Sequence, residues 1–419
     1  MSNLNSVVNV SIQLQTGAAL GESFDYICLF GPLPAAWSAW EASTAYTVGA
    51  MVYNGTHVYR CKTAGTSGDT GGPTATSGDI SDGTDTPVIW NYVQEIPADV
   101  GIYTSLTEVQ DAGWVTTGVS ADPIGAAANV AFAQNPRPDK IYIAYQKLGE
   151  SGYEAISDTL TRAKTFGGWY VACPAGVLES EFEDMAEWIE GNTLLFGYTY
   201  IGSTDPVGNG YYRSFGFCGK VTDTQEAANV PLSNQFMSVG AAVKCLSYQS
   251  GSETWAYKNL AGITPSEFSD TFIATLEAAN TNYFETLAGQ NVTRLGKVKA
   301  GEWIDVIRFR DWLENDMRVG VASVLLTNPK IPYTDSGIAL IRTAMVTSLM
   351  RGQTNGGIAT TSIADDGTLI PGFEVSVPSA ASISAADKAA RVLNNCKFEA
   401  YLSGAIHLVK IVGYLSYLG

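Results

Sequence analysis

The sequence contains few of the residues from which enzyme sites are usually built. Only two histidines, His57 and His407, occur in 419 residues, and neither has an obvious carboxylate or nucleophile beside it in the sequence. A Ser-His-Asp triad cannot be assembled around them. The chain also has no G-x-S-x-G, P-loop or H-E-x-x-H motif. These absences predict that the protein is not an enzyme and has no cofactor.

Cysteine is also scarce. The chain has six cysteines, far apart and without a C-x-x-C pair: Cys28, Cys61, Cys173, Cys218, Cys245 and Cys396. A zinc site or a disulfide framework calls for closer or more regular spacing. We therefore expect reduced thiols, mostly in the core, with neither a metal nor a disulfide.

Charged residues are few and unbalanced. They make up 16 % of the chain, with a net charge of −17, whereas about 25 % is typical of soluble domains. Nucleic-acid binding needs a basic face, and binding to an anionic membrane needs a run of Lys or Arg, so neither partner is expected. A low charged fraction with 21 Tyr and 9 Trp suits a protein that buries surface against copies of itself.

Long apolar runs are missing as well. No segment approaches the roughly 20 apolar residues of a membrane span. The first residues lack the basic and apolar regions of a signal peptide. The sequence therefore predicts a protein that is made soluble in the cytoplasm.

The two ends of the chain carry apolar segments typical of strands. Four apolar residues alternate with polar ones over 7–15, which is the period of a strand with one dry face: Val8, Val10, Ile12 and Leu14. Residues 400–418 are apolar almost throughout and are also predicted to form a strand. Their candidate assembly residues are Ile406, Leu408, Val409 and Ile411. Two arrangements remain open: both strands pair within their own domain, or at least one completes a sheet in a neighbouring molecule.

Between these ends the sequence predicts two larger units. Residues 23–36 and 93–250 alternate between strands and helices, which indicates crossover units and an α/β domain with parallel pairing. The last helix of this unit is expected over 227–245. Residues 251–397 form a helix-rich domain, with 1–22 as the N-terminal arm and 398–419 as the C-terminal arm. In the helix-rich domain we expect a strand over 254–257, a hairpin over 292–299 and helices over 265–279, 303–326, 334–350 and 385–393.

Residues 37–92 differ in composition from the rest and predict a small all-β insertion. Asn54-Gly55 lies between two short strand patterns and is a strong hairpin signal. The segment resembles the small carbohydrate-binding modules of chitinases at Trp40, 46–49, 53–56, 59–61, 65–68, Pro73 and Trp90. The resemblance implies that aromatic rings stack on sugar faces, with these candidates: Trp40, Tyr46, Tyr53, Tyr59 and Trp90. The alternative is that most of these rings form the core of the module.

An acidic cluster is the best candidate for catalytic carboxylates. It comprises Glu179, Glu181, Glu183, Asp184 and Glu187. Paired carboxylates are the machinery of glycosidases. Acidic residues are also favoured at a solvated helix N-terminus by the helix dipole, which is the interpretation we prefer.

Several segments outside the insertion carry a second resemblance. They are 255–266, 279–283, 301–305, 311–313 and 330–337, and upstream 105–109, 131–134 and 140–143. In these segments the chain resembles the tail sheath proteins of contractile-tailed bacteriophages. This resemblance implies a sheath-type mixed α/β fold whose terminal strands add to the sheets of neighbouring subunits. It also implies stacked hexameric rings around a tail tube, with baseplate and tail terminator proteins as further partners. Gly17, Gly21 and Gly413 would be the hinges of the arms.

The expected function is thus a structural subunit of the phage tail, assembled in the host cytoplasm and contracting to drive the tube through the host envelope. The alternative is a phage glycan-binding adhesin, or a cell-wall glycosidase, that carries the 37–92 module. An enzyme would also need carboxylates in a cleft.

Overall fold

The computed structural model describes residues 23–149, 152–364 and 367–412. The predicted strand over 7–15, with Val8, Val10, Ile12 and Leu14, therefore lies outside the described residues. The same holds for the three predicted hinges, Gly17, Gly21 and Gly413.

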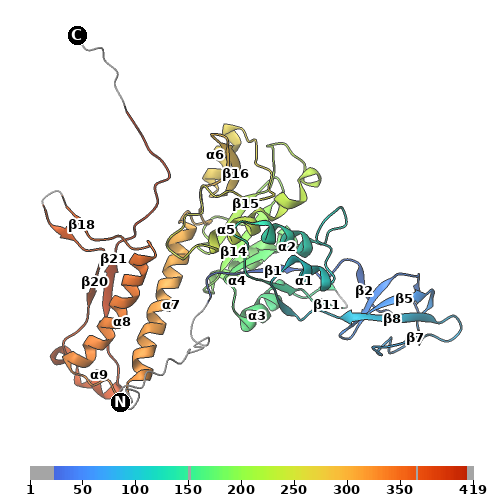
Figure 1. Cartoon of the computed structure of the whole chain (residues 1–419), viewed down its shortest axis with the longest axis horizontal. Coiled ribbons are helices and arrows are strands. Elements are labelled where there is room, and N and C mark those ends of the chain that lie inside the picture. Colours follow the sequence, from blue (N-terminus) through green and yellow to red (C-terminus); the bar gives the residue numbers. More distant parts are fainter. Residues whose placement is uncertain (1–22, 150–151, 365–366, 413–419) are drawn as a thin grey trace, which may run out of the picture.

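The centre of the molecule is a sheet of six strands in the order β15-β14-β13-β1-β10-β9 (Figure 1). Its strands are β1 (Ile27–Gly31), β9 (Val100–Tyr103), β10 (Ile141–Tyr145), β13 (Val171–Pro174), β14 (Leu195–Tyr200) and β15 (Ser214–Cys218). All pairs are parallel except β10–β9. Every residue of β1, β10, β13, β14 and β15 is buried, as expected where helices cover both faces of a parallel sheet. The predicted α/β class is confirmed.

Helices lie on both sides of this sheet. The bounds are α1 (Leu106–Asp111), α2 (Pro123–Ala133), α3 (Ile156–Phe166), α4 (Phe182–Glu190) and α5 (Met237–Leu246). Helices α2 and α5 pack together against one face, and α3 and α4 against the other. A short hairpin, β11 (Leu148–Gly149) and β12 (Gly152–Tyr153), precedes α3.

The all-β insertion leaves the domain after β1, returns before β9 and projects from one side of the molecule (Figure 1). Its strands are β2 (Trp37–Ala39), β3 (Ala45–Tyr46), β4 (Met51–Asn54), β5 (His57–Thr63), β6 (Gly65–Thr66), β7 (Asp79–Asp82) and β8 (Val88–Glu95). Five of them form one sheet in the order β2-β4-β5-β8-β7. The predicted Asn54-Gly55 hairpin is present, with Gly55 at a φ of 62°.

Residues 254–299 differ from the expectation. The predicted strand over 254–257 is absent, since Tyr257 has a φ of 60°, outside the range of a strand. The predicted helix from Pro265 begins instead as α6 (Asp270–Ala278), because Ser266 N–H bonds to the carbonyl of Phe284 and holds this segment extended. The hairpin is formed by β16 (Tyr283–Leu287) and β17 (Gln290–Arg294) and turns at 288–289, before the predicted position.

The helix expected over 227–245 is also shorter than predicted. Two 3-10 turns, Ala227–Asn229 and Leu232–Phe236, precede α5. Pro231 separates them, and the residue before a proline is biased away from the helical conformation. Val230 accordingly has a ψ of 129°.

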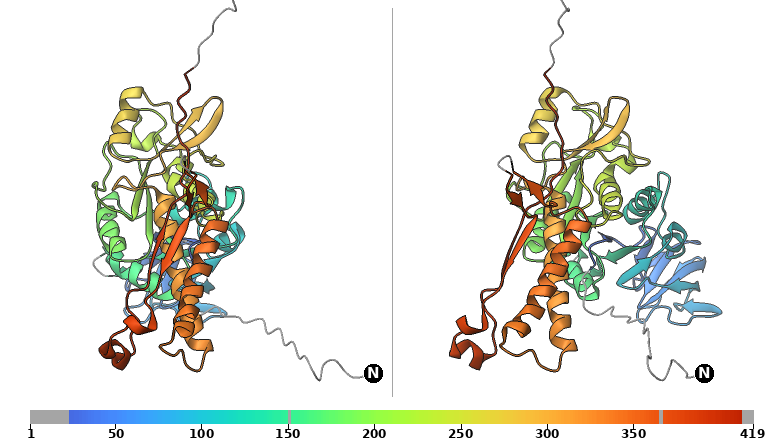
Figure 2. Two further views of the ribbon diagram at one scale, coloured as in Figure 1. Left: turned by 90° about the vertical axis from the view of Figure 1, so that its left-hand side faces the viewer. Right: turned by 60° about the vertical axis from the view of Figure 1, so that its left-hand side comes forward.

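The C-terminal part is built on two long antiparallel helices, α7 (Ile304–Thr327) and α8 (Asp335–Thr354), as predicted (Figure 2). Thr334 begins α8 by accepting a hydrogen bond from the N–H of Gly337. The remaining elements are β18 (Ser362–Ile363), β19 (Leu369–Ile370), β20 (Phe373–Ser376), α9 (Ala385–Ala390) and β21 (Lys397–Ala400). Strands β20 and β21 pair antiparallel.

The predicted C-terminal strand is wrong for the single chain. Strand β21 ends at Ala400, and 401–412 contain only one isolated bridge, between Leu402 and Ile358. A strand needs the backbone groups of a partner strand, and this segment has no such partner among the described residues. We call residues 401–412 the C-terminal arm from here on.

The hydrophobic core divides within α7. The main cluster runs from Phe24 to Ile307 and includes residues of α6 and β16. A second cluster around Tyr59 and Trp90 belongs to the insertion. The third comprises Phe309, Leu313, Leu349 and Ile358. One continuous helix therefore belongs to the α/β core at its start and to the C-terminal part beyond it.

Candidate assembly surface

Helix α7 is fixed to the α/β core by a buried arginine. Arg308 has no exposed surface and donates to Glu253 Oε1 at 2.6 Å and to Asp25 Oδ1 at 3.1 Å. It also donates to four backbone carbonyls, those of Phe24, Cys245, Leu246 and Tyr248. Because the planar guanidinium presents several donors at once, one side chain joins four segments of the chain.

Two acidic residues of α7, Asp305 and Asp311, also lie on the side of the helix that packs against the α/β core. Asp311, 1 % exposed, accepts from Tyr170 Oη at 2.7 Å and from both terminal nitrogens of Arg213. Burial and the charge of Glu253 raise the pKa of Asp305 to about 6, and its Oδ1 is buried without a hydrogen-bond partner among the described residues. The start of α7 is therefore held to the α/β core by a buried polar network.

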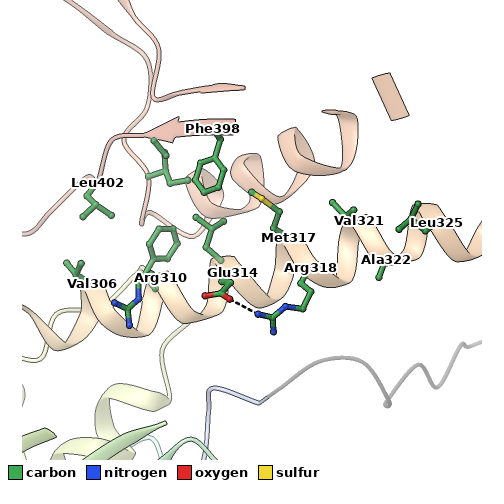
Figure 3. Close-up of a pocket in the computed structure, with 14 residues that line it drawn as sticks. Val306, Arg310, Glu314, Met317, Arg318, Val321, Ala322, Leu325, Phe398 and Leu402 are labelled. Carbon is green, nitrogen blue, oxygen red and sulfur yellow. Dashed lines mark hydrogen bonds and ion pairs between the residues drawn. The ribbon is translucent and has the colours of Figure 1, made fainter. Parts of the chain in front are cut away.

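The distal part of α7 lines an apolar groove of about 860 Å³ (Figure 3). One wall is a row of α7 residues at intervals of four: Phe309, Leu313, Met317, Val321 and Leu325. The other wall comes from Ile358 and from Phe398, Ala400 and Leu402 at the end of β21. On the rim, Arg318 donates to Glu314 at 2.5 Å. Since the walls are apolar, the groove favours an apolar occupant.

Next to the groove is an incomplete sheet. Strands β20 and β21 form a sheet of two strands only, so each has one edge that pairs with no other described strand. Phe398 in β21 is 44 % exposed. Such an edge presents unpaired N–H and C=O groups to an incoming strand.

The predicted assembly residues of the C-terminal arm are exposed. The exposed fractions are 83 % for Ile406, 74 % for Leu408, 68 % for Val409 and 87 % for Ile411. The arm is an extended segment that continues from β21 past the start of α7 (Figure 2). Contiguous exposed apolar side chains of this kind mark interaction sites.

The five predicted sugar-binding rings of the insertion differ in how far they are buried. Tyr59 and Trp90 are fully buried, so neither ring presents a surface to a sugar. Trp40, Tyr46 and Tyr53 are half-buried. The indole N–H groups of Trp40 and Trp90 both donate to Asp82 Oδ2, at 2.8 and 3.1 Å. The rings thus build the core of the module in large part, and sugar binding at the three half-buried rings stays a prediction.

The acidic cluster lies at the start of α4, as preferred above. Glu179 and Glu181 form a 3-10 turn, and Glu183 and Asp184 are in the first turn of α4. Glu179 Oε1 accepts from the N–H of Ile201 at 3.0 Å, a structural role. Among the described residues, no group of three or more His, Cys, Asp or Glu side chains has the arrangement of a metal site.

The place where doubly wound sheets bind ligands is filled by protein here. From β1 the chain adds β10 on one side of the sheet, and then β13, β14 and β15 on the other side, so the order of the strands reverses between β1 and β13. In folds of this kind, ligands bind beyond the carboxyl ends of the two strands where the order reverses. A Cβ on Gly31 would lie 1.9 Å from the carbonyl oxygen of Ala175, and one on Gly176 would lie 2.8 Å from Pro32. The backbones therefore pack directly against each other at this edge.

Residues 304–414 match the family model described as E217 tail sheath protein gp31-like, C-terminal domain. This segment contains the groove, the β20–β21 edge and the arm. The predicted resemblance to tail sheath proteins is confirmed, and the expectation of a structural protein rather than an enzyme agrees with it.

Two solved structures of contractile systems have the same fold. A chain of the anti-feeding prophage baseplate is 13 % identical, with a TM-score of 0.56, over 76 % of this chain and 87 % of that one. A chain of the extracellular contractile injection system PVC sheath complex, in the contracted state, is 11 % identical with a TM-score of 0.50, and 97 % of each chain is covered. No curated protein sequence matches the chain. In the described part of the chain no helix is both long and apolar enough to span a membrane.

The sequence alone did not reveal the groove. Its signal was present as the four-residue spacing from Phe309 to Leu325, but the same spacing is typical of a helix face covered by its own domain. The opposite wall, at Phe398 and Leu402, lies far along the chain, and its position depends on the tertiary structure.

Proposed function

We propose that the protein is a sheath subunit of a contractile phage tail or phage-like injection system. In this proposal it polymerises as stacked hexameric rings around a tail tube and contracts to drive the tube through the host envelope. The observation that carries it is the combination of an apolar groove, an open sheet edge and an exposed apolar arm, all within the segment that matches the sheath family model.

In this proposal the arms connect the subunits. A strand from a neighbouring copy would pair with the open edge of the β20–β21 sheet and insert alternate apolar side chains into the groove. Residues 7–15 have the required alternation, and 406–411 have the required exposed apolar side chains. Gly17, Gly21 and Gly413 would then let these connections survive the movement of subunits.

Further partners follow from the same proposal. A sheath subunit contacts the tail tube along its length and baseplate and terminator proteins at the two ends. It is a component of the virion tail, or of the corresponding injection particle, and is assembled in the producing cell's cytoplasm. In this proposal the sheath domains keep the bounds expected from the sequence, 23–36 with 93–250 and 251–397, with 1–22 and 398–419 as the segments that connect subunits.

The test is electron microscopy of the purified full chain over a range of concentrations. We expect tubes or rings with six-fold symmetry. Deleting residues 1–16 should leave the subunit folded, judged by circular dichroism, but should abolish assembly. A chain that stays monomeric at high concentration contradicts the sheath proposal, and tubes formed without residues 1–16 contradict the connecting role of the N-terminal arm.

The insertion has a second proposed role, as a surface module that binds a glycan through Trp40, Tyr46 and Tyr53. Their partial exposure supports the proposal. The full chain should be retained on chitin or bacterial polysaccharide, and Tyr53→Ala should reduce retention. Equal retention of the variant, or no retention on any glycan, would leave the module without this role.

A further inference from the structure

One residue of the exposed C-terminal arm is held against the body of the subunit. His407 is the only residue from Tyr401 to Val412 whose side chain is not exposed. Its Nε2 lies 2.8 Å from Thr254 Oγ1. Its backbone carbonyl accepts a hydrogen bond of 2.5 Å from Tyr257 Oη.

The imidazole ring also fits between two aromatic rings. It meets Trp303 edge-to-face, with centroids 4.6 Å apart and an interplanar angle of 88°. It meets Tyr257 in the same way at 5.7 Å and 89°. Edge-to-face pairs of this geometry contribute stability beyond the area they bury. The imidazole of His407 is therefore in contact with an aromatic ring on each of two sides. The neighbouring side chains of Ile406 and Leu408 are largely exposed.

The residues around His407 are fixed by the body of the subunit. Tyr257 N–H donates to the carbonyl of Thr293 in β17, and Lys258 N–H donates to Thr293 Oγ1. Trp303 is the N-cap residue of α7, and Lys297 Nζ lies 5.1 Å from the centre of its ring. Contacts outside the arm thus hold the backbone of Tyr257 and the ring of Trp303.

We infer that Thr254, Tyr257 and Trp303 form a docking socket that takes the side chain of His407 and fixes the direction in which 408–412 leave the subunit. Closer to β21, the arm is held by Tyr401 and Ser403, whose N–H groups bond to Gly372 and Gly357. The free part thus begins after His407. A shorter free segment loses less conformational entropy on binding a neighbour, so the socket prepares the arm for assembly.

The charges around the socket favour the neutral form of the imidazole. Partial burial, and then the positive charge of Lys258, lower the pKa of His407. Lys297 adds a second positive charge over the ring of Trp303, and the carboxylate of Glu302 accepts a hydrogen bond from Trp303 N–H. Phenylalanine at 407 would keep the ring contacts and lose only the bond to Thr254.

The test is limited proteolysis with trypsin of full-chain subunits diluted below the assembly concentration. Lys410 lies only three residues beyond His407, so a protease that binds the extended chain before Lys410 competes with the socket, and docking of His407 should slow the cleavage. We expect His407→Ala to release 411–419 about five- to tenfold faster, by mass spectrometry, since local opening sets the cleavage rate. His407→Phe should restore part of the protection. His57→Ala, which removes the other histidine of the chain, is the control and should behave as the wild type.

Unchanged cleavage of His407→Ala overturns the socket. The effect on assembly rests on the proposed function: His407→Ala should raise the concentration needed for tube formation several-fold. Deleting 408–419 separates the two proposals. If tubes still form without these residues, the arm does not connect subunits and the proposed role of the arm fails, while the proteolysis result on the socket stands independently.

Discussion

At the scale of single residues, Arg308 decides how the two halves of the subunit are joined. Its charge is buried beside Glu253, which also has no exposed side-chain surface. Removing one partner of such a pair leaves the other buried without compensation, which costs about 3–5 kcal/mol. By contrast, the exposed pair Arg318–Glu314 on the same helix contributes about 0.5 kcal/mol or less.

We therefore predict that Arg308→Ala strongly lowers the urea midpoint of unfolding of the C-terminal part, whereas Arg318→Ala changes it little. The two variants remove the same side chain from the same helix, so the comparison isolates burial. Urea titrations followed by circular dichroism measure the difference. Equal midpoints for the two variants would contradict the role assigned to Arg308.

Asp305 gives a prediction of pH dependence. Its pKa is raised from 3.8 to about 6 in the folded chain, mainly by burial and by Glu253. The folded state therefore binds this proton more tightly than the unfolded state, so its contribution to stability improves as the pH falls from 7 toward 4. Asp305→Asn should stabilise the subunit at pH 7 by about 2–3 kcal/mol.

The measurement is the free energy of unfolding of both proteins between pH 4 and pH 8. The difference between Asp305→Asn and the wild type should shrink toward pH 4. A difference that stays constant with pH would mean that the carboxylate is not destabilised by its site.

At the scale of elements, α7 takes part in two separate structural features. Its start belongs to the polar network with the α/β core, and its distal part lines the groove. The groove and the polar network therefore lie on one continuous helix. This arrangement fits a subunit that must keep its connections to neighbours while its body changes position.

The groove gives a prediction about assembly. Phe398→Glu places a charge on an apolar wall, where an incoming apolar strand would bury it. Since Phe398 is 44 % exposed, the variant should fold normally but need at least about a tenfold higher concentration to assemble. Leu178→Glu, at a site 68 % exposed on the α/β domain, is the control. Sedimentation of assembled particles measures the effect, and normal assembly of Phe398→Glu would exclude the groove as the receiving site.

At the scale of the whole molecule, the inserted module is an addition to a complete sheet. Strand β9 runs antiparallel to β10, so the end of β1 and the start of β9 lie at the same edge, one strand apart. That separation is about 10 Å, which a short linker spans. Trp37 packs against Gly113 and Gln94 bonds to the carbonyl of Ala112, so few contacts cross from the module to its host.

Replacing 37–92 with a flexible linker of about six residues should therefore leave a folded chain that assembles as the full chain does. Thermal unfolding and electron microscopy check the two parts of this prediction. Loss of folding would show that the module is part of the host core, and loss of assembly with a stable fold would place the module in an interface between subunits.

The sequence by itself determined the elements whose signals are local. The alternation of strand and helix patterns over 93–200 predicted the parallel sheet. Asn54-Gly55 predicted the hairpin of the module, and Thr334 predicted the start of α8. In each case the period or the cap lies within the element that it specifies. The apolar character of the arm was equally clear from the sequence.

Only the tertiary structure decided the features that depend on distant partners. Ser266 follows a strong helix start signal, but its N–H bonds to Phe284 and the helix begins later. The arm has the residues of a strand, but it forms none in a single chain, because a strand is completed by hydrogen bonds from another strand. The groove joins α7 to the end of β21, and His407 reaches Thr254 across 153 positions of sequence. Such contacts follow from the folded arrangement of the whole chain, which no local pattern encodes.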